Sequence, residues 1–167
     1  YAVFDEKGFK EERYWDVKFS ENYYLEPEEK FFNLFKDSVE KRLMSDVSLG
    51  AFLSGGIDST AVVSQMGDNV KTFTIGFEDD PTNTLKDAKI VSEHFGTNHH
   101  ELVDDKSILN ILPRVIYHLD EPIVEPSILP GFKLAEFAKK HVTVALAGEG
   151  ADEILYGYPH YKMLGFA

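Results

Sequence analysis

A Gly-Gly turn between an apolar run and a helical pattern is the feature that most constrains how this chain folds. The apolar run covers residues 47–53 and the helical pattern covers residues 60–66. The turn between them reads Leu53-Ser54-Gly55-Gly56-Ile57-Asp58-Ser59. Two adjacent glycines allow backbone conformations closed to other residues and let a ligand approach the main chain closely. A strand, a tight turn and the start of a helix are therefore predicted to meet at one point.

The same turn carries the chemistry of a phosphate site. The first N–H groups of a helix have no partner within the helix and carry positive partial charge, which suits phosphate oxygens. Ser54 and Ser59 add hydroxyl donors, whereas the Asp58 carboxylate repels phosphate unless a cation lies between them. Because Mg²⁺ shares its oxygen ligands with phosphates, the pattern indicates a magnesium-bound polyphosphate. A plain turn capped by Asp58 and Ser59 is the alternative.

The turn resembles the SGGxDS pyrophosphate-binding loop of the N-type ATP pyrophosphatases, which cleave ATP between its α and β phosphates. It does not match the Walker sequence G-x-x-x-x-G-K-[ST], because no lysine follows the glycines. The resemblance implies an ATP site of the pyrophosphatase kind.

Composition excludes several other classes of function. The chain has 167 residues, 43% of them hydrophobic and 28% charged, which is ordinary for one globular domain. It contains no cysteine, so disulfides and thiolate metal sites are excluded, and a cytoplasmic setting fits. The formal net charge of -12 disfavours nonspecific binding to nucleic acid or to anionic membranes. No apolar run reaches the roughly 20 residues that span a bilayer.

Alternating apolar and helical patterns predict an α/β fold. Strands are expected at residues 47–53, 70–77, 99–103 and 142–147. Helices are expected at residues 25–43, 60–66, 84–95, 107–119 (restarted at Pro113) and from the cap Ser127 to residue 140. Strands separated by such helices argue for a parallel sheet with helices on both faces, in which ligands bind at the carboxyl ends of the strands.

Residues 25–43 show the clearest periodic pattern. Phe31, Phe35, Val39 and Leu43 recur every four residues with Phe32 beside them, so the predicted helix has one apolar stripe for the core. Residues 1–24 mix aromatic and charged residues without a clear period. We expect them to form a connector that packs on another part of the protein.

A second glycine-rich segment follows the last predicted strand and should lie at the same edge of the sheet. It reads Ala147-Gly148-Glu149-Gly150-Ala151-Asp152-Glu153. Several carboxylates this close together are costly unless a cation or a reacting electrophile uses them. Taken alone, the segment also fits a solvated acidic loop. Beside the first loop, we interpret it as part of the same site.

The two loops together resemble the asparagine synthetase family, specifically its ATP-dependent synthetase domain. Further motifs of that family stand in the same order between about residues 28 and 161, the last of them as a Gly/Tyr-rich loop. They are Phe73-Thr74-Ile75-Gly76-Phe77, Gly96-Thr97-Asn98-His99-His100-Glu101, Asp120-Glu121-Pro122 and Tyr156-Gly157-Tyr158. Several motifs in the family's order identify the family more specifically than any single motif does. The resemblance implies a Rossmann-like α/β fold of the adenine nucleotide alpha hydrolase type.

The resemblance also implies a role for each loop residue. The residues that would frame the adenosine of ATP are Leu53, Ile75, Ala147 and Gly148, although strand-end packing alone would explain Leu53 and Ile75. Those that would hold the β and γ phosphates are Ser54, Gly55, Gly56 and Ser59. Asp58 and Asp152 would hold Mg²⁺, with a helix cap as the alternative for Asp152. Glu149 would serve formation of the β-aspartyl-AMP intermediate.

The chemistry implied by the resemblance is amide formation. ATP activates the side-chain carboxylate of aspartate, pyrophosphate leaves, and ammonia displaces AMP from the acyl adenylate to give asparagine. A β-lactam synthetase-like protein, or another amidotransferase of the family, would differ only in the acceptor pocket. GMP and NAD synthetases share SGGxDS but should lack the 148–153 segment. A non-catalytic nucleotide-binding module is a further alternative.

The chain departs from the family pattern in several places. Ala147 stands where the family usually has Ser, and Leu155-Tyr156 replaces the usual Phe-Gly. The family's amino-terminal glutaminase domain, with its leading Cys, and a carboxy-terminal part with a catalytic Lys are not in the sequence. We therefore expect residues 1–24 to connect to a missing amino-terminal domain. Residues 25–167 would be the nucleotide-binding part of the synthetase domain, truncated at its carboxy end.

Two other motifs allow more than one interpretation. His99 and His100 are adjacent, and adjacent strand residues point to opposite faces, so a structural role is favoured over a shared metal ion. The Asp120-Glu121-Pro122 motif either borders the substrate or simply ends a helix. The sequence leaves the oligomeric state open, a homo-oligomer included.

Overall fold

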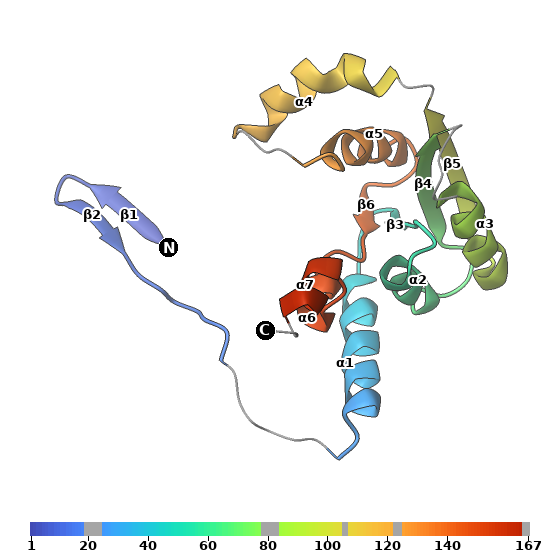
Figure 1. Ribbon diagram of the computed structural model, residues 1–167, viewed down its shortest axis with the longest axis horizontal. Helices are drawn as coiled ribbons and strands as arrows, with labels where there is room; N and C mark the ends of the chain where they lie inside the picture. Colours follow the sequence, from blue (N-terminus) through green and yellow to red (C-terminus); the bar gives the residue numbers. More distant parts are fainter. Residues whose placement is uncertain (19–24, 78–83, 105–106, 122–124, 165–167) are drawn as a thin grey trace. The chain divides into compact units, whose positions relative to one another are not determined.

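Four short strands form one parallel sheet in the computed structural model of the chain (Figure 1). They are β3 (Leu49–Phe52), β4 (Lys71–Phe77), β5 (Asn98–Asp104) and β6 (Val144–Leu146), in the spatial order β5-β4-β3-β6. Gly50 lies opposite both Lys71 of β4 and Ala145 of β6, so β3 is a central strand. The chain runs from β3 outward to β5 and then returns to the other side of β3. The carboxyl ends of β3 and β6 therefore flank a topological switch point, where open α/β sheets bind ligands.

The structure describes residues 1–18, 25–77, 84–104, 107–121 and 125–164. The chain divides into two compact units, Tyr1–Leu34 and Phe35–Ala167, and helix α1 (Pro27–Arg42) runs across the division. Pro122 of the Asp120-Glu121-Pro122 motif lies outside the described residues. Among the helices of the described ranges, none has the length and apolar character needed to cross a membrane.

Helices link the strands, as parallel pairing requires. They are α2 (Ile57–Ser64) after β3, α3 (Thr84–Phe95) after β4, and η1 (Ser107–Ile111), α4 (Leu112–Leu119) and α5 (Ile128–Ala138) between β5 and β6. Pro113 stands in the first turn of α4, where its missing N–H breaks no helical hydrogen bond, and the predicted restart at this residue is confirmed. The parallel α/β arrangement predicted from the sequence is confirmed as well.

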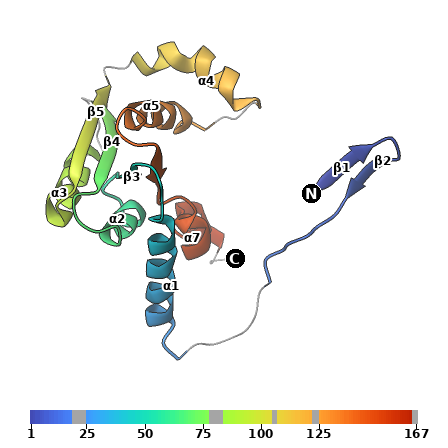
Figure 2. The same ribbon diagram turned by 180° about the vertical axis from the view of Figure 1, so that it is seen from behind.

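Side-chain alternation along β3 explains why helices cover both faces of the sheet. Ala51 and Leu53 pack in a cluster with residues of α2 and α3. Phe52, which lies between them in the sequence, packs with the cluster around Phe73 and α5 instead. Figures 1 and 2 show the result, with α2 and α3 on one side of the sheet and α5 on the other.

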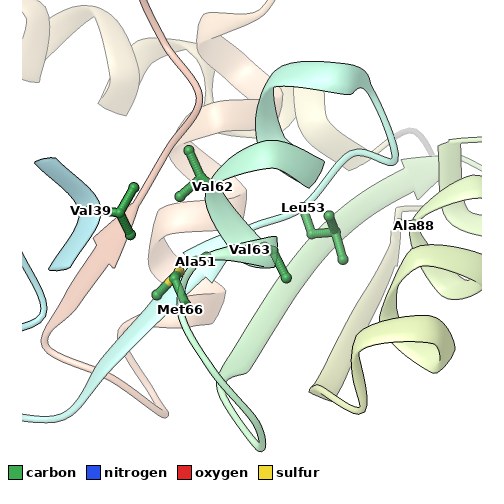
Figure 3. Packing of buried hydrophobic residues seen from close by; sticks show 7 residues of the cluster. All are labelled: Val39, Ala51, Leu53, Val62, Val63, Met66 and Ala88. Carbon is green, nitrogen blue, oxygen red and sulfur yellow. The ribbon is translucent and has the colours of Figure 1, made fainter. Parts of the chain in front are cut away.

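The cluster beneath α2 and α3 is the larger of the two (Figure 3). Its buried members are Val39, Ala51, Leu53, Val62, Val63, Met66 and Ala88. Helix α1 supplies Val39, with Phe35 and Leu43 packed against the same cluster, so three positions of the predicted apolar stripe reach the core. Phe31 and Phe32 of the same helix remain about half exposed, at 50% and 52%.

Helix α5 is held on the opposite face by apolar and ionic contacts. Ala138 and Val142 are buried there around the fully buried ring of Phe73. Lys133 of α5 also forms an ion pair with Asp104, whose side chain is buried at the end of β5. These contacts fix α5 beside the carboxyl ends of β4 and β5.

Four elements arise in two regions where the sequence showed no regular pattern. In the amino-terminal unit, β1 (Ala2–Asp5) and β2 (Gly8–Glu11) form an antiparallel hairpin with Phe4 opposite Phe9. Every residue of both strands is exposed, so no alternation between buried and polar positions marks them. Beyond Gly150, the expected Gly/Tyr-rich loop contains two short helices, α6 (Ala151–Leu155) and α7 (Pro159–Leu164).

The predicted cap of α5 is wrong. Ser127 precedes the helix, but its side chain makes no capping hydrogen bond, and its φ and ψ of -68° and -16° are already helical. The hydroxyl instead donates to Oε1 of Glu125 at 3.3 Å. A capping side chain needs extended backbone at its own residue, and Ser127 does not have it.

Candidate functional site

A pocket of about 500 Å³ opens at the carboxyl ends of the central strands, beside the switch point. Leu53 and Ser54 reach it from the end of β3, Ile75 from β4, and Ala147 from the end of β6. Parallel pairing brings the ends of these strands together although they lie far apart in the sequence. The two glycine-rich loops therefore face a common space.

The first loop enters the pocket through a turn that glycine alone fits. Gly55 has a φ of 78°, in the left-handed region, and a Cβ there would lie 2.6 Å from the main-chain carbonyl carbon of Asp87. Gly56 follows as the N-cap of α2, and no side chain in the described residues caps this helix. The first N–H groups of α2 are thus available to a ligand or to water.

The two serine hydroxyls of this loop hold the turn closed. Ser54 Oγ and Ser59 Oγ are 3.0 Å apart, and the Ser54 N–H donates to Ser59 Oγ at 3.2 Å. Ser59 Oγ also donates to the Gly56 carbonyl oxygen at 3.2 Å, and the Gly56 N–H donates to Ser54 Oγ at 3.3 Å. Both hydroxyls are engaged within the turn, so a ligand that used them would have to replace one of these bonds.

The second loop packs directly on the first turn of α2. A Cβ at Gly148 would lie 2.8 Å from both the Asp58 carbonyl carbon and the Ser59 nitrogen. Gly150 then takes a φ of 91° and starts α6, which carries Asp152 in its first turn. The absence of a side chain at residue 148 is therefore what lets the two loops touch.

The pocket wall is strongly acidic. Asp58, Glu149 and Asp152 all line it, and none of its described lining residues is Lys or Arg. A polyphosphate in this pocket would meet carboxylates and would be repelled unless a cation lay between them.

Asp58 and Asp152 fit a magnesium ion that is shared with phosphates. They come from the first turns of α2 and α6, and both line the same pocket. Across the described ranges, no group of three or more His, Asp or Glu side chains is arranged to hold a metal ion. Two carboxylates are enough for Mg²⁺, which usually takes its other ligands from phosphate oxygens and water. They would not make a complete metal site by themselves.

Tyr158 lines the pocket and is tied to α6. Its hydroxyl donates to Oε1 of Glu153 at 2.7 Å. This hydrogen bond raises the pKa of Tyr158 to about 12 and lowers the pKa of Glu153, because it stabilises the neutral phenol and the ionised carboxylate. The Gly157 N–H donates to the Asp152 carbonyl oxygen at 3.1 Å. The chain after α6 therefore turns back onto that helix.

The structure brings most of the predicted site residues together. Those that line the pocket are Leu53, Ser54, Asp58, Ser59, Ile75, Ala147, Gly148, Glu149 and Asp152. Gly55 and Gly56 do not line it, since they shape the turn behind it. Further lining residues that the sequence did not indicate are Phe52, Thr74, Thr84, Gly131, Leu134, Gly150 and Tyr158. Thr74, Gly150 and Tyr158 stand inside motifs already noted, whereas Gly131 and Leu134 come from α5, where no motif marked them.

The described residues of the two remaining motifs do not line the pocket. His99 Nδ1 is 2.9 Å from Thr72 Oγ1, whereas His100 stacks on the ring of Phe73 with 5.3 Å between centroids. Their contacts lie on opposite faces of β5, as alternation requires, so they do not converge on one ion. Asp120 has a φ of 58° at the end of α4 and does not line the pocket, so it ends a helix.

Comparison with known proteins gives consistent matches. The family model described as asparagine synthase matches residues 30–166. The asparagine synthetase [glutamine-hydrolyzing] 1 of Bacillus subtilis (strain 168) is 42% identical over 130 residues, which are 75% of this chain and 21% of that protein. The putative asparagine synthetase [glutamine-hydrolyzing] 2 of Methanocaldococcus jannaschii is 40% identical over 131 residues, 75% of this chain and 25% of that protein. The chain thus spans about a fifth to a quarter of the length of these relatives.

Solved structures share the fold. The NH3-dependent NAD synthetase from Campylobacter jejuni has a TM-score of 0.53 at 18% identity, covering 78% of this chain and 60% of that one. The glutamine-dependent NAD+ synthetase from Acinetobacter baumannii has a TM-score of 0.51 at 18% identity, covering 94% and 31%. The expected fold of the adenine nucleotide alpha hydrolase type is confirmed. Since the asparagine synthase model matches most of its length, this chain belongs to the asparagine synthase family.

Proposed function

We propose that the pocket binds ATP and that the chain is the nucleotide-binding part of an enzyme that forms asparagine from aspartate. The observation that carries the proposal is the convergence of the two glycine-rich loops on one acidic pocket at the switch point. Membership of the asparagine synthase family supports the choice of reaction. The chain spans only part of its relatives, so the reaction is assigned to the longer protein.

The pocket wall suggests how the nucleotide lies. Leu53, Ile75, Ala147 and Gly148 are apolar or small and line the ends of three strands, so we place the adenosine against them. Such a surface leaves room for a flat base and its ribose. Ala147 offers no hydroxyl there, so contacts to the nucleoside at this position would be apolar or through the main chain.

The phosphates would lie at the start of α2. The uncapped N–H groups of this helix favour anionic oxygens, and Gly55 and Gly56 shape the turn that presents them. Ser54 and Ser59 would each exchange a hydrogen bond within the turn for one to a β or γ phosphate oxygen.

Asp58 and Asp152 would hold Mg²⁺ against these phosphates. When bound there, Mg²⁺ neutralises phosphate charge and stabilises the pyrophosphate as it leaves. The main-chain N–H groups of the first loop support the same leaving group from fixed positions. Asp58 and Asp152 would be repelled by the nucleotide without the ion, so binding should require it.

The bond changes of the proposed reaction are simple. The side-chain carboxylate of aspartate attacks the α phosphorus of ATP, an acyl–phosphate bond forms, and pyrophosphate leaves. Ammonia then attacks the acyl carbon, loses a proton, and AMP leaves with the oxygen that linked it. Glu149 lines the pocket and would orient the incoming carboxylate or amine in these steps. Holding both reactants in the pocket supplies much of the rate increase.

The source of ammonia would be a glutaminase domain of the same longer protein. The two relatives are named as glutamine-hydrolysing synthetases, and this chain covers 21% and 25% of them. The amino-terminal residues 1–24, with their exposed hairpin, would connect to such a domain, and residues 25–167 would hold the nucleotide. We place this activity in the cytoplasm, where ATP, aspartate and ammonia are available.

The first experiment measures thermal unfolding with ATP, with and without Mg²⁺. Ligand at about 100 times its dissociation constant should add about 2.7 kcal/mol to the free energy of unfolding. For a chain of this length that is a rise of several degrees, at about 2–4 °C per kcal/mol. An equal rise with ATP and EDTA would contradict the role of the metal. No rise under any condition would contradict the nucleotide site in this chain.

Replacement of the two aspartates tests their assignment as metal ligands. Asp58→Asn and Asp152→Asn should weaken Mg²⁺-dependent ATP binding more than AMP binding, because AMP lacks the β and γ phosphates. Asp68→Asn is the control, since it removes the same charge from an exposed residue outside the pocket. Calorimetry with both nucleotides gives the comparison. Equal losses for ATP and AMP would mean that Asp58 and Asp152 act through the fold instead.

The reaction itself is tested by pyrophosphate release that depends on both aspartate and ammonia, with asparagine measured in parallel. The longer protein should turn over, and the 167-residue chain should be far slower. The described pocket residues include no cation for the α phosphate, and losing one such electrostatic donor costs about 10²–10³ in rate. Nucleotide turnover with a different acceptor, such as an internal amine that closes a ring, would point to the β-lactam synthetase-like alternative.

A further inference from the structure

The segment that follows α6 packs back against Asp152, which lies in the first turn of that helix. We call residues 156–158 the return turn. After α6 the chain reverses at Tyr156, which has a φ of 59°, and Gly157 comes to lie against Asp152. A methyl group at residue 157 would overlap Oδ1 of Asp152. The Gly157 N–H also donates to the Asp152 carbonyl oxygen at 3.1 Å.

Two hydrogen bonds close the return turn, and only one of them uses side chains. The backbone bond joins Gly157 to Asp152, and the side-chain bond joins the Tyr158 hydroxyl to Oε1 of Glu153 at 2.7 Å. A hydrogen bond to an ionised carboxylate is stronger than one between neutral groups. The Tyr158–Glu153 bond ties the residue after Gly157 to α6, and so helps to keep Gly157 beside Asp152.

We propose that the Tyr158–Glu153 hydrogen bond positions Asp152 for the metal ion of the nucleotide, an inference that rests on the proposed function above. Helix α6 has only five residues, and so short a helix does not hold its side chains by its own hydrogen bonds. Mg²⁺ demands nearly ideal octahedral geometry, so a small displacement of one carboxylate weakens its binding. The return turn supplies the rigidity that α6 lacks.

Glu153 acts through Asp152 and not on the ligand. Asp152 lines the pocket and Glu153, the next residue, does not. Tyr158 also lines the pocket, but its hydroxyl is already hydrogen-bonded to Glu153. Both are positioning residues in this account, and their loss should change the requirement for Mg²⁺ while leaving the adenosine contacts intact.

The experiment compares Tyr158→Phe, Glu153→Ala and the double variant with the unaltered chain. Tyr158→Phe removes only the hydroxyl and keeps the aromatic ring, and Glu153→Ala changes a residue outside the pocket. The control is Tyr161→Phe, which removes a hydroxyl from the same aromatic cluster, 5.4 Å from the Tyr158 ring, but lies outside the pocket. Glu153 is exposed, whereas Tyr158 and Tyr161 are half-buried, so thermal unfolding checks that each variant is folded.

The main measurement is the Mg²⁺ concentration that gives half-maximal binding at fixed ATP. It should rise about 2- to 10-fold in each single variant, as expected for the loss of one hydrogen bond. The double variant should be no worse than either single one, because both remove the same bond. Affinity for AMP should stay the same in every variant. Amide hydrogen exchange at Gly157, measured without any ligand, should be faster in the same three variants.

The possible results separate this inference from the proposed function. If the unaltered chain binds no ATP with Mg²⁺, the proposed function fails, and the inference fails with it. If the unaltered chain binds Mg²⁺ and ATP but the variants behave like Tyr161→Phe, only the positioning role is overturned. Additive losses in the double variant, or equal losses for AMP, would show that Tyr158 and Glu153 act separately on the nucleotide.

Discussion

Gly148 is the residue at which the two loops of the site meet. A Cβ at this position would lie 2.8 Å from main-chain atoms of Asp58 and Ser59, which cannot rotate away as the end of a flexible side chain can. Gly148→Ala should therefore push the loops apart, at a cost of about 1–3 kcal/mol in the free energy of unfolding. ATP affinity should fall by about tenfold or more, since both loops form the pocket. Calorimetric titration with ATP and thermal unfolding measure the two effects.

Gly131 is the matched control for this prediction. It also lines the pocket, but a Cβ there would meet no atom within 4 Å. It lies inside α5, where alanine is favoured over glycine by up to about 1 kcal/mol. Gly131→Ala should stabilise the chain and leave ATP affinity unchanged. If Gly148→Ala bound ATP as tightly as Gly131→Ala, contact between the loops would not be what shapes the site.

Tyr156 is the bulkiest residue with a positive φ in the described ranges. It is a bulky side chain at a φ of 59°, at the end of α6, where the resemblance implies glycine. The left-handed conformation costs a side-chain-bearing residue roughly 1–2 kcal/mol, and glycine avoids this cost. Part of the gain is offset by the greater freedom of glycine in the unfolded chain. Tyr156→Gly should raise the free energy of unfolding by up to about 1 kcal/mol in urea titrations.

Asn69 offers the comparison for Tyr156, because it has a φ of 60° and asparagine tolerates this region better. Asn69→Gly should gain less than Tyr156→Gly. The tyrosine ring lies 5.4 Å from that of Tyr161, and both are near the protein surface. A net loss of stability in Tyr156→Gly would mean that this ring contact outweighs the backbone cost.

At the scale of elements, α5 begins without the cap that its sequence suggests. Ser127 has helical backbone angles and makes no capping hydrogen bond, so its hydroxyl contributes only an exposed contact with Glu125. Ser127→Ala should change the free energy of unfolding by less than about 0.5 kcal/mol, as for other surface substitutions. Chemical denaturation decides the question. A loss of about 1 kcal/mol or more would indicate a working cap in solution.

At the scale of the whole molecule, two histidines of β5 should make stability depend on pH. Burial lowers the pKa of His99, a shift that the Glu101 carboxylate partly opposes. Burial also lowers the pKa of His100, with smaller contributions from the neighbouring His141 and Lys71. Below the ordinary histidine pKa, near 6.5, the unfolded chain therefore binds more protons than the folded one. The stabilising contribution is present above that pH and is lost as pH falls through the folded pKa values.

The measurement is urea denaturation at pH 7.5 and at pH 5.5. The free energy of unfolding should be lower at the acidic pH, and His100→Phe should reduce the difference. Phenylalanine keeps the stacking on Phe73 and removes both the titrating group and a buried Nε2 without a hydrogen-bond partner in the described residues. An unchanged pH difference in His100→Phe would assign the effect to other groups.

Local patterns account for most of the central fold. Two patterns predicted elements correctly, because side chains repeat with a different period in a helix and in a strand. The stripe of Phe35, Val39 and Leu43 predicted a helix, and the apolar run before Gly55 predicted a strand. The order of strands and helices then implied a parallel sheet, which is confirmed. The hairpin that contains Phe4 and Phe9 was not predicted, because strands exposed on both faces show no alternation of apolar and polar residues.

The sequence by itself determined which chemical groups are available near the strand ends: two glycine turns, two serines and several carboxylates. Only the tertiary structure decided how they meet. The return from β5 to β6 across β3 created the switch point, and α5 added Gly131 and Leu134 to the wall. Gly148 packs against α2, and Tyr158 is hydrogen-bonded to Glu153. No periodic pattern of apolar residues in the sequence predicts either contact. A one-dimensional pattern reports local conformation, whereas such contacts depend on how whole elements pack.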